Sequence, residues 1–282
     1  MKYKIFVYGT LMSGMNNHHY LENSKYLGNC EIEGYEMYHL GYYPGIIEGK
    51  GKIKGEAYEI DEDTLHLIDF LEGEGSLYIR KEIETEYGKT FLYVYNKSID
   101  KHNKIPCEMQ PYNNLVYYVS YGSNMLEERF LYYIKGGLNK YNNKYQKGCT
   151  NKNNPIEGIP VLVPYNMYYS KYSQTWNGAV SFISLEKEGL AYGKAYLITK
   201  EQFNEVKEQE GGWYSKEVDL PKIKGISAKT FTSEIELVHK DISYVSESYI
   251  NVLIQGIENT FNNLSKEDIK KYLKDCGKEG GK

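Results

Sequence analysis

The segment Gly55–Gly73 reads GEAYEIDEDTLHLIDFLEG, and its pattern recurs without a gap at Gly193–Gly211 as GKAYLITKEQFNEVKEQEG. Each copy begins with Gly-x-Ala-Tyr-x-Ile, which is typical of a strand, and then takes the spacing of a helix. Each copy ends in Glu-Gly, which places a glutamate in the last turn of the helix and a glycine at the position that ends it. The repeat therefore predicts a duplicated domain in which Glu72 and Glu210 hold equivalent places.

A second shared element marks the start of each copy. Tyr8-Gly9-Thr10 and Tyr121-Gly122-Ser123 each follow a short β-prone run, and the glycine stops that run as in a strand that enters a tight turn. The two elements extend the duplication over most of the chain, whose 282 residues suit two domains of ordinary size. We predict domains over residues 1–112 and 113–282, with a polar, proline-containing connection over 96–114.

The second copy carries an insertion. Tyr8 and Glu72 are 64 positions apart, whereas Tyr121 and Glu210 are 89 apart, so the second copy has 25 additional residues. They lie mostly around Gly136–Ser170, a stretch rich in Asn, Lys, Gly and Tyr. This composition suits a long loop, a lid over a pocket or a disordered surface insertion.

The composition narrows the classes of function. Lys and Arg number 34 against 38 Asp and Glu, a net charge of -4, and no basic stripe of the kind that a phosphate backbone requires is present. We therefore expect no nucleic-acid partner. The N-terminal apolar run is too short for a signal sequence, and no stretch approaches the ~20 apolar residues of a membrane span. We expect a soluble cytoplasmic protein without membrane contact.

Cysteine and histidine give no sign of a metal site. The 4 Cys form no Cys-x-x-Cys pair, and the 6 His lack a His-Glu-x-x-His or comparable spacing. A chain of this length folds on its hydrophobic core without disulfides. We predict free structural thiols and no metal.

Helix-start signals place both glutamates in register. Asp61 and Thr199 each lie eleven positions before the glutamate and are good N-caps, and Thr199 with Gln202 fits a capping box. Glu72 and Glu210 each extend an apolar stripe along one helical face, at i, i+3 and i+7. The apolar members of these stripes are Leu65, Ile68, Phe203 and Val206.

A carboxylate on such a stripe loses contact with water, and the negative end of the helix dipole further disfavours its charged form. We therefore expect raised pKa values for Glu72 and Glu210. A raised pKa suits general acid/base work near neutral pH, because the group can both take and return a proton. The alternative is a solvated last-turn glutamate, which is the usual interpretation of one copy alone. Recurrence of the glutamate favours function.

The loop of the second copy continues as Tyr121-Gly122-Ser123-Asn124, with an amphipathic run over 125–134 behind it. Asn124 and Glu127 have the spacing of an N-terminal cap, so strand, turn and helix are the expected order. Main-chain N–H groups in such a turn form a concavity that binds anions, and the helix N-terminus adds positive potential. A substrate carboxylate fits there, whereas the alternative is a turn that needs glycine only for its backbone angles.

Together these residues resemble the γ-glutamylcyclotransferases, whose members pair a Tyr-Gly-Ser/Thr loop with a later Glu-Gly motif. The first half resembles the compact branch that includes γ-glutamylamine cyclotransferases, and the second half resembles the branch that acts on γ-glutamyl amino acids. The motifs of the first half are Tyr8-Gly9-Thr10-Leu11, Tyr43-Pro44-Gly45-Ile46, Glu72-Gly73 and Leu77-Tyr78-Ile79-Arg80. Those of the second half are Tyr121-Gly122-Ser123-Asn124, Ser173-Gln174-Thr175-Trp176-Asn177-Gly178 and Glu208-Gln209-Glu210-Gly211.

The resemblance implies an α+β fold of two tandem units, each a small curved mixed β-barrel with packed helices and a cavity between the loop and the glutamate. It also implies a reaction without a cofactor. The α-amino group of a small γ-glutamyl substrate attacks the side-chain amide carbonyl, closes 5-oxoproline and expels an amine or amino acid. Glu72 or Glu210 would take a proton from the α-ammonium and return one to the departing nitrogen.

The resemblance further implies a set of substrate-contacting residues. The set consists of Tyr8, Gly9, Thr10, Leu11, Tyr78, Tyr121, Gly122, Ser123, Asn124, Trp176 and Tyr214. The alternative function is a non-catalytic module that captures a γ-glutamyl or other anionic ligand, with one or both units inactive and the duplication serving avidity or regulation. The leaving group, the oligomeric state and the role of the Gly136–Ser170 stretch stay open.

Overall fold

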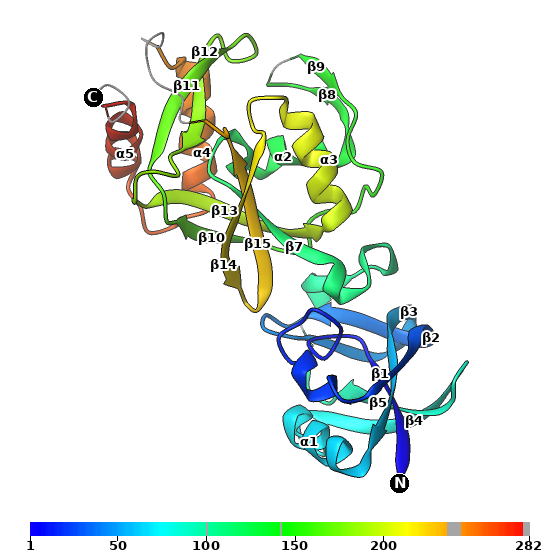
Figure 1. The fold of residues 1–282 in the computed structure, drawn as a ribbon. Helices are drawn as coiled ribbons and strands as arrows, with labels where there is room; N and C mark the ends of the chain where they lie inside the picture. Colours follow the sequence, from blue (N-terminus) through cyan, green and yellow to red (C-terminus); the bar gives the residue numbers. More distant parts are fainter. Residues whose placement is uncertain (100, 142, 236–243, 279–282) are drawn as a thin grey trace. The chain divides into compact units, whose positions relative to one another are not determined.

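The computed structural model describes residues 1–99, 101–141, 143–235 and 244–278 (Figure 1). The chain forms two compact units, Met1–Leu115 with Lys222–Ile226, and Val116–Pro221 with the chain from Ser227 onward. The boundary expected after residue 112 lies three residues before this division. Both units combine helices with a mixed sheet, which confirms the α+β class.

The first unit is built on a mixed sheet with the strand order β4-β5-β1-β3-β2-β6. Its strands are β1 (Lys2–Val7), β2 (Lys25–His39), β3 (Pro44–Asp61), β4 (Tyr78–Thr85), β5 (Gly88–Tyr95) and β6 (Lys104–Ile105). Neighbouring strands pair antiparallel except β1 and β5, which are parallel. Helix α1 (Glu62–Glu72) follows β3 without a loop and packs on β1 and β3.

The long hairpin of β2 and β3 gives this sheet its curvature. Its register shifts twice, between Tyr26 and Gly28 and between Glu33 and Tyr35. Such bulges bend a strand and increase its twist. Figure 1 shows both strands as long, bent ribbons. The bend gives the curved sheet that the family resemblance implies.

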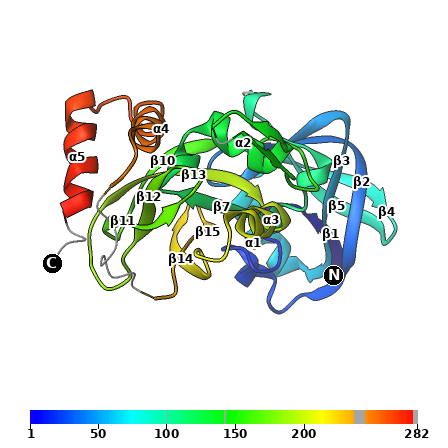
Figure 2. The ribbon, with the colours of Figure 1, turned by 90° about the horizontal axis from the view of Figure 1, so that it is seen from above.

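The second unit is built on a sheet with the strand order β10-β13-β7-β15-β14. These strands are β7 (Leu115–Ser120), β10 (Gly158–Val163), β13 (Ala191–Thr199), β14 (Lys216–Ile223) and β15 (Ile226–Thr232). Two separate hairpins are β8 (Gly137–Asn139) with β9 (Lys144–Gln146), and β11 (Met167–Ser173) with β12 (Gly178–Ile183). The helices are α2 (Glu127–Lys135), α3 (Lys200–Glu210), α4 (Glu247–Glu258) and α5 (Lys266–Lys278). α4 and α5 lie side by side in both views (Figure 1, Figure 2).

The strand order of the second sheet repeats that of the first. When β10, β13, β7, β15 and β14 are matched with β2, β3, β1, β5 and β4, the strands follow in the same order, and the first sheet adds β6 beside β2. β7 pairs in parallel with β15, as β1 does with β5. In both units the strand before the Glu-Gly helix, β3 or β13, continues directly into that helix. The structure thus confirms the predicted duplication.

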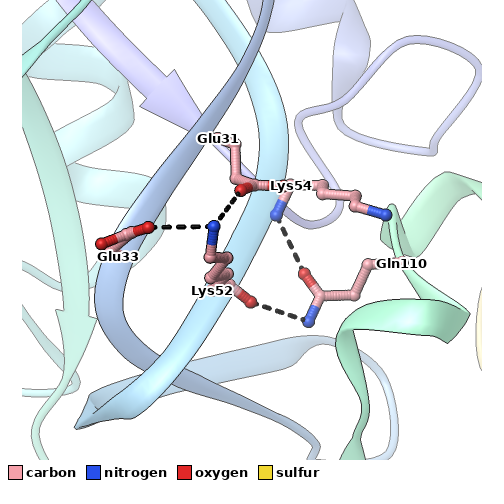
Figure 3. Close-up of polar contacts among 5 residues, drawn as sticks. All are labelled: Glu31, Glu33, Lys52, Lys54 and Gln110. Atoms are coloured by element: carbon pink, nitrogen blue, oxygen red, sulfur yellow. Dashed lines mark hydrogen bonds and ion pairs between the residues drawn. The ribbon is translucent and has the colours of Figure 1, made fainter.

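The stretch 96–114 packs on the first unit and is not a free connection. β6 pairs with β2, and Gln110 is only 5% exposed. The Gln110 side chain accepts a hydrogen bond from Lys54 N at 2.9 Å and donates one to Lys52 O at 3.2 Å (Figure 3). It also donates to Ile105 O at 3.3 Å. Glutamine is mostly an exposed residue in proteins, so the sequence alone does not predict that the Gln110 side chain is buried.

An exposed cluster of ion pairs lies on the β2–β3 hairpin, beside the strand residues that Gln110 contacts. Lys52 Nζ is 3.1 Å from Glu31 Oε1 and 2.9 Å from Glu33 Oε1 (Figure 3). Exposed ion pairs contribute little to stability, because water screens them. Removing a partner from a buried hydrogen bond costs about 1–3 kcal/mol. We infer that Gln110 holds the 96–114 stretch to β3, whereas the Lys52 ion pairs join β3 to β2.

Of the three alternatives left open for the Gly136–Ser170 stretch, a disordered insertion does not describe the parts that form strands. The stretch contains the β8–β9 hairpin and all of β10, and β10 is the counterpart of β2 and pairs with β13 along its whole length. The sequence did not predict these strands, because the stretch is rich in polar residues, which are common both in loops and at sheet edges. Residue 142 lies outside the described ranges.

Two other expectations concern thiols and membrane helices. Among the described residues, Cys30, Cys107, Cys149 and Cys276 form no disulfide, as predicted. Across the described ranges, no helix has both the length and the apolar character needed to cross a bilayer.

Candidate functional site

Glu72 is the last residue of α1, a helix that is fixed at both ends. Asp61 is its predicted N-cap, and the Asp61 Oδ1 atom accepts a hydrogen bond from Thr64 N at 2.9 Å. Gly73 follows the glutamate with φ 58° and ψ 49°, the left-handed conformation in which glycine commonly ends a helix. The two ends determine where the last turn, and therefore the glutamate, lies.

A polar cluster under the last turn adds a third restraint. Asp69, three residues before Glu72, accepts hydrogen bonds from Arg80 Nη1 and from the Tyr93 hydroxyl. Arg80 lies on β4 and Tyr93 on β5, so the cluster ties the helix to two strands. Ile68, on the predicted apolar stripe, is fully buried. Glu72 is therefore carried by a rigid element, as a preorganised site requires.

Glu72 lines a cavity of about 440 Å³. Its walls come from the loop after β1, the start of β3, the end of α1, and strands β4 and β5. The lining residues include Tyr8, Gly9, Thr10, Leu11, Tyr43, Pro44, Leu71, Leu77, Tyr78 and Tyr93. All the first-half residues that we expect to contact substrate lie at this cavity.

Two tyrosine hydroxyls attach the cavity walls to the main chain. Tyr8 OH donates a hydrogen bond to Tyr93 O, and Tyr78 OH donates one to Pro44 O, both at 2.8 Å. Burial raises the pKa of Tyr8 and of Tyr78 well above the ordinary value, and the nearby Glu72 charge adds to the rise in both. Both phenols therefore stay protonated and act as fixed hydrogen-bond donors.

The loop after β1 presents unused main-chain donors. Among the described residues, the N–H groups of Gly9, Thr10 and Leu11 have no acceptor. A Cβ atom on Gly9 would come within 2.7 Å of Pro44 Cγ, so close approach of the loop to β3 requires glycine. Free N–H groups at a cavity wall can bind an anionic or carbonyl oxygen of a ligand.

The Glu72 carboxyl is half-buried and accepts no hydrogen bond from the described residues. Burial alone raises its pKa from 4.5 to about 7. A carboxyl with this pKa populates its charged and neutral forms about equally near neutral pH. It can therefore both take and return a proton there.

The raised pKa links Glu72 to the stability of the first unit. The folded state binds the proton of the Glu72 carboxyl more tightly than the unfolded state does. The contribution of the protonated carboxyl to the stability of the folded state is therefore complete below pH 4.5 and declines as the pH rises through about 7. We expect Glu72→Gln to raise the free energy of unfolding by about 3 kcal/mol at about pH 8, and to leave it unchanged at about pH 4. Urea unfolding across this pH range measures the difference.

The matched control for this prediction is Glu74→Gln, which removes an exposed carboxylate two residues away. Its stability difference from the wild type is expected to be small, because the side chain is exposed to water. A Glu72→Gln effect that did not vary with pH would contradict the prediction, because only a titrating group produces the dependence.

In the second unit, Glu210 is the last residue of α3, and the start of this helix carries the predicted capping box. Thr199 Oγ1 accepts a hydrogen bond from Gln202 N, and Gln202 Oε1 accepts one from Thr199 N, both at 3.1 Å. Phe203 and Val206 bury the apolar stripe that leads to Glu210. The two glutamates thus sit at the same place in equivalent helices.

Glu210 lies between two spaces of very different size. The space beside the Tyr121-Gly122-Ser123 loop is about 30 Å³, which is roughly the volume of one water molecule. Its walls include Tyr118, Tyr121, Tyr214 and Tyr249. A second cavity of about 270 Å³ is lined by Ser123, Arg129, Tyr133, Lys144, Ser173, Thr175, Trp176, Gln209 and Glu210 itself, among others. Tyrosine rings therefore fill the loop side of this site, and the other side is open.

Both carboxylate oxygens of Glu210 accept hydrogen bonds, unlike those of Glu72. Asn124 Nδ2 donates to Oε1, and Tyr133 OH donates to Oε2 at 3.4 Å. Burial raises the pKa of Glu210, whereas Arg129 and the two hydrogen bonds oppose the rise.

These contacts correct the predicted helix cap. A 3-10 turn, Ser123–Met125, precedes α2, and the N-cap is Leu126, without a side-chain hydrogen bond. Asn124 donates instead to the buried carboxylate, and Glu127 accepts a hydrogen bond from the buried Lys194 Nζ at 2.8 Å. The extra turn moves the helix start, and the charged partners bind the two side chains more strongly than a cap would.

The second-half residues expected to contact substrate also gather at their glutamate. Tyr121, Gly122, Ser123, Asn124 and Tyr214 line the narrow space, and Trp176 lines the larger cavity. Sequence reasoning missed Tyr93 in the first unit, and Arg129, Tyr133 and Tyr249 in the second. No local signal marks these residues, because their partners in the site lie far from them in the chain.

Comparison with known proteins gives a match to one family. The family model described as "Gamma-glutamyl cyclotransferase, AIG2-like" matches residues 5–114, which lie in the first unit. The gamma-glutamylcyclotransferase family protein YtfP of Escherichia coli is 42% identical over 97 residues, which cover 34% of this chain and 86% of that protein.

Solved structures similar to this chain include two crystal structures. The uncharacterized protein PH0828 from Pyrococcus horikoshii is 41% identical and matches 36% of this chain and 85% of its own, with a TM-score of 0.33. YkqA from Bacillus subtilis is 22% identical and matches 98% of both chains, with a TM-score of 0.40.

Proposed function

Because the chain belongs to the γ-glutamylcyclotransferase family, we propose that it releases 5-oxoproline from small γ-glutamyl compounds, with Glu72 as the general acid/base of the first unit. The leaving group is an amine or an amino acid, and the reaction uses no cofactor. Glu210 holds the equivalent role in the second unit.

The observation that carries this proposal is the Glu72 carboxyl at the wall of the first-unit cavity. It accepts no hydrogen bond from the described residues, and its pKa of about 7 follows from burial alone. The carboxyl is therefore free to bind a substrate ammonium group. Gly9, Thr10 and Leu11, with their free N–H groups, line the same cavity.

The proposed reaction needs one group that moves protons. The α-nitrogen of the substrate gives a proton to Glu72 and attacks the γ-carbonyl carbon, so that a C–N bond forms and a five-membered ring closes. The original amide C–N bond then breaks as Glu72 returns its proton to the departing nitrogen. The second proton that the α-nitrogen loses leaves with the released amine as ammonium.

The remaining requirement is orientation, because nucleophile and carbonyl belong to the same molecule. A site that holds the folded conformer can supply roughly 7–11 kcal/mol of the barrier. The N–H groups of the loop can donate hydrogen bonds either to the α-carboxylate of the substrate or to the oxyanion that develops on its γ-carbonyl. Tyr8 and Tyr78, tied to the main chain, keep the cavity walls in place.

A second candidate function applies to the second unit, namely ligand binding without turnover. The observation that favours it is the space of about 30 Å³ beside the Tyr121-Gly122-Ser123 loop, where tyrosine rings occupy the volume that a substrate would need. The open cavity of about 270 Å³ beside Glu210 supports catalysis instead. Activity measurements on separate variants distinguish the two.

The experiment that tests the proposal is release of 5-oxoproline, followed by mass spectrometry, from a panel of γ-glutamyl amino acids and γ-glutamyl amines. Wild type, Glu72→Gln, Glu210→Gln and the double variant are compared. Product that disappears with Glu72→Gln assigns the activity to the first unit, and product that disappears only in the double variant assigns it to both. No product from any substrate, with binding still detected by calorimetry, supports the binding module.

A further inference from the structure

A closed ring of hydrogen bonds surrounds the Glu210 carboxylate. Asn124 donates to Oε1 and accepts from Arg129 Nη1. Tyr133 OH donates to Oε2 at 3.4 Å, and Arg129 Nη2 donates to the same hydroxyl at 3.4 Å. Because the ring includes both carboxylate oxygens, it opposes rotation of the group as well as its displacement.

Arg129 closes this ring from inside the protein. Its side chain is only 4% exposed, and its guanidinium carbon lies 5.3 Å from the ring centre of Tyr133 and 5.4 Å from that of Trp176. Within the described part of the chain its Nε has no hydrogen-bond partner. A buried guanidinium is costly unless a negative charge compensates it. The carboxylate that the ring joins to Arg129 is Glu210.

The described residues of the first unit form no equivalent of this ring. In the loop pattern Leu11 holds the place of Asn124, and a leucine side chain cannot donate a hydrogen bond. Correspondingly, Glu72 accepts no hydrogen bond from the described residues. The two equivalent glutamates therefore differ in whether a buried cation is joined to them.

We infer that Arg129 is a positioning residue of the second unit, which acts through Asn124 and Tyr133 to fix the orientation of the Glu210 carboxylate and to stabilise its charged form. This inference deepens the proposed function and rests on Glu210 as the acid/base group of that unit. Its consequence is that removal of the Arg129 charge favours the neutral form of the Glu210 carboxyl.

Other titratable groups also face Glu210, and all but one of them are tyrosines. They are Tyr118 from β7, Tyr121 from the following loop, Tyr133 from α2, Tyr214 from the segment after α3, and Tyr249 from α4. Burial raises the pKa of each of these phenols, so they stay neutral where a carboxyl titrates. Lys144 from β9 lines the same cavity as Glu210. Because Lys144 is a second cation at this cavity, the variant Lys144→Met, which removes its charge, is included in the test.

The test is a direct titration of Glu210 in the full-length protein. Glutamate labelled with carbon-13 at the side-chain carboxyl is followed by NMR against pH, and the signal that Glu210→Gln removes is assigned to Glu210. Arg129→Met keeps the volume and removes the charge, so its Glu210 midpoint is expected to rise by about one pH unit or more. Arg129→Lys restores the charge, and its midpoint is expected near that of the wild type.

An Arg129→Met midpoint equal to the wild-type midpoint overturns the inference, as does a midpoint that moves with Lys144→Met instead. If Arg129→Met does not fold, Asn124→Ala and Tyr133→Phe each remove one hydrogen bond at the carboxylate and leave the cation in place. Each is expected to raise the midpoint, and unchanged midpoints in both overturn the inference.

Activity gives an independent readout. In a Glu72→Gln background, the measured activity comes from the second unit. The acidic limb of its kcat/KM profile against pH is expected to move to higher pH with Arg129→Met. With Arg129→Lys it is expected to return to the position of the Glu72→Gln parent. Absence of 5-oxoproline at every pH would refute the proposed activity of the second unit, whereas the NMR titration would still decide the role of Arg129.

Discussion

Glu72→Gln is expected to lower kcat for 5-oxoproline release by the first unit at least about 100-fold, and by as much as about 10⁴-fold, since this is the usual range for loss of a general acid/base. KM is expected to change little, because glutamine keeps the shape of the side chain and the loop donors are untouched. Steady-state kinetics in a Glu210→Gln background isolates the first unit and gives both constants.

The control variant is Glu74→Gln, at an exposed glutamate two residues further on, which is expected to keep wild-type kinetics. A loss of less than about tenfold with Glu72→Gln would mean that another group moves the proton. A large rise in KM with kcat unchanged would mean that Glu72 binds the substrate ammonium but does no proton transfer.

Gly55→Ala is expected to destabilise the first unit by about 3 kcal/mol, at the upper end of the usual range for overpacking. A Cβ atom at Gly55 would lie 2.3 Å from Val7 O and 2.6 Å from the tip of the Phe6 ring. Val7 O is a main-chain atom of β1, so relief requires that β1 and β3 move apart. The loop that begins at Tyr8 would then move with β1.

The duplication provides the matched control, Gly193→Ala. A Cβ atom there would meet Ser120 O at 3.2 Å and Val163 Cγ2 at 3.1 Å, contacts that small shifts relieve, so the expected cost is below about 1 kcal/mol. Calorimetric melting combined with hydrogen exchange of first-unit and second-unit peptides measures both variants. Equal destabilisation by the two alanines would show that the close approach of β1 and β3 is not what requires glycine.

Local signals were enough to predict the helices that carry the two glutamates. Asp61 and Thr199 cap them as their side-chain chemistry predicts, and Gly73 ends α1 in the left-handed conformation that glycine favours. The repeat also predicted that whatever fold the first half adopts, the second half shares it. Neither signal contained the strand order, because strand pairing is decided by contacts between residues far apart in the chain.

The candidate site was predictable at the level of its motifs, and its contacts were not. Loop and glutamate come together in each unit, but the hydrogen bond from Asn124 to Glu210 joins residues 86 positions apart. The rule that assigns Asn124 to a helix cap uses only neighbouring residues, so it cannot take into account a carboxylate so far along the chain. Arg129 was missed for the same reason, since a buried arginine is recognisable only when its partners are known.

The hydrogen bonds of the loop tyrosines bear on how the two units could diverge. Tyr8 OH donates to the main-chain oxygen of Tyr93, and Tyr121 OH donates to that of Phe231, at 2.8 Å in both cases. Every residue type supplies a main-chain oxygen, so mutation at the acceptor position leaves the anchor intact. The acceptor side chain is a phenol bonded to an aspartate in one unit and a phenyl ring in a hydrophobic cluster in the other. After a gene duplication, such an arrangement lets natural selection alter the surroundings of one loop without losing the loop itself.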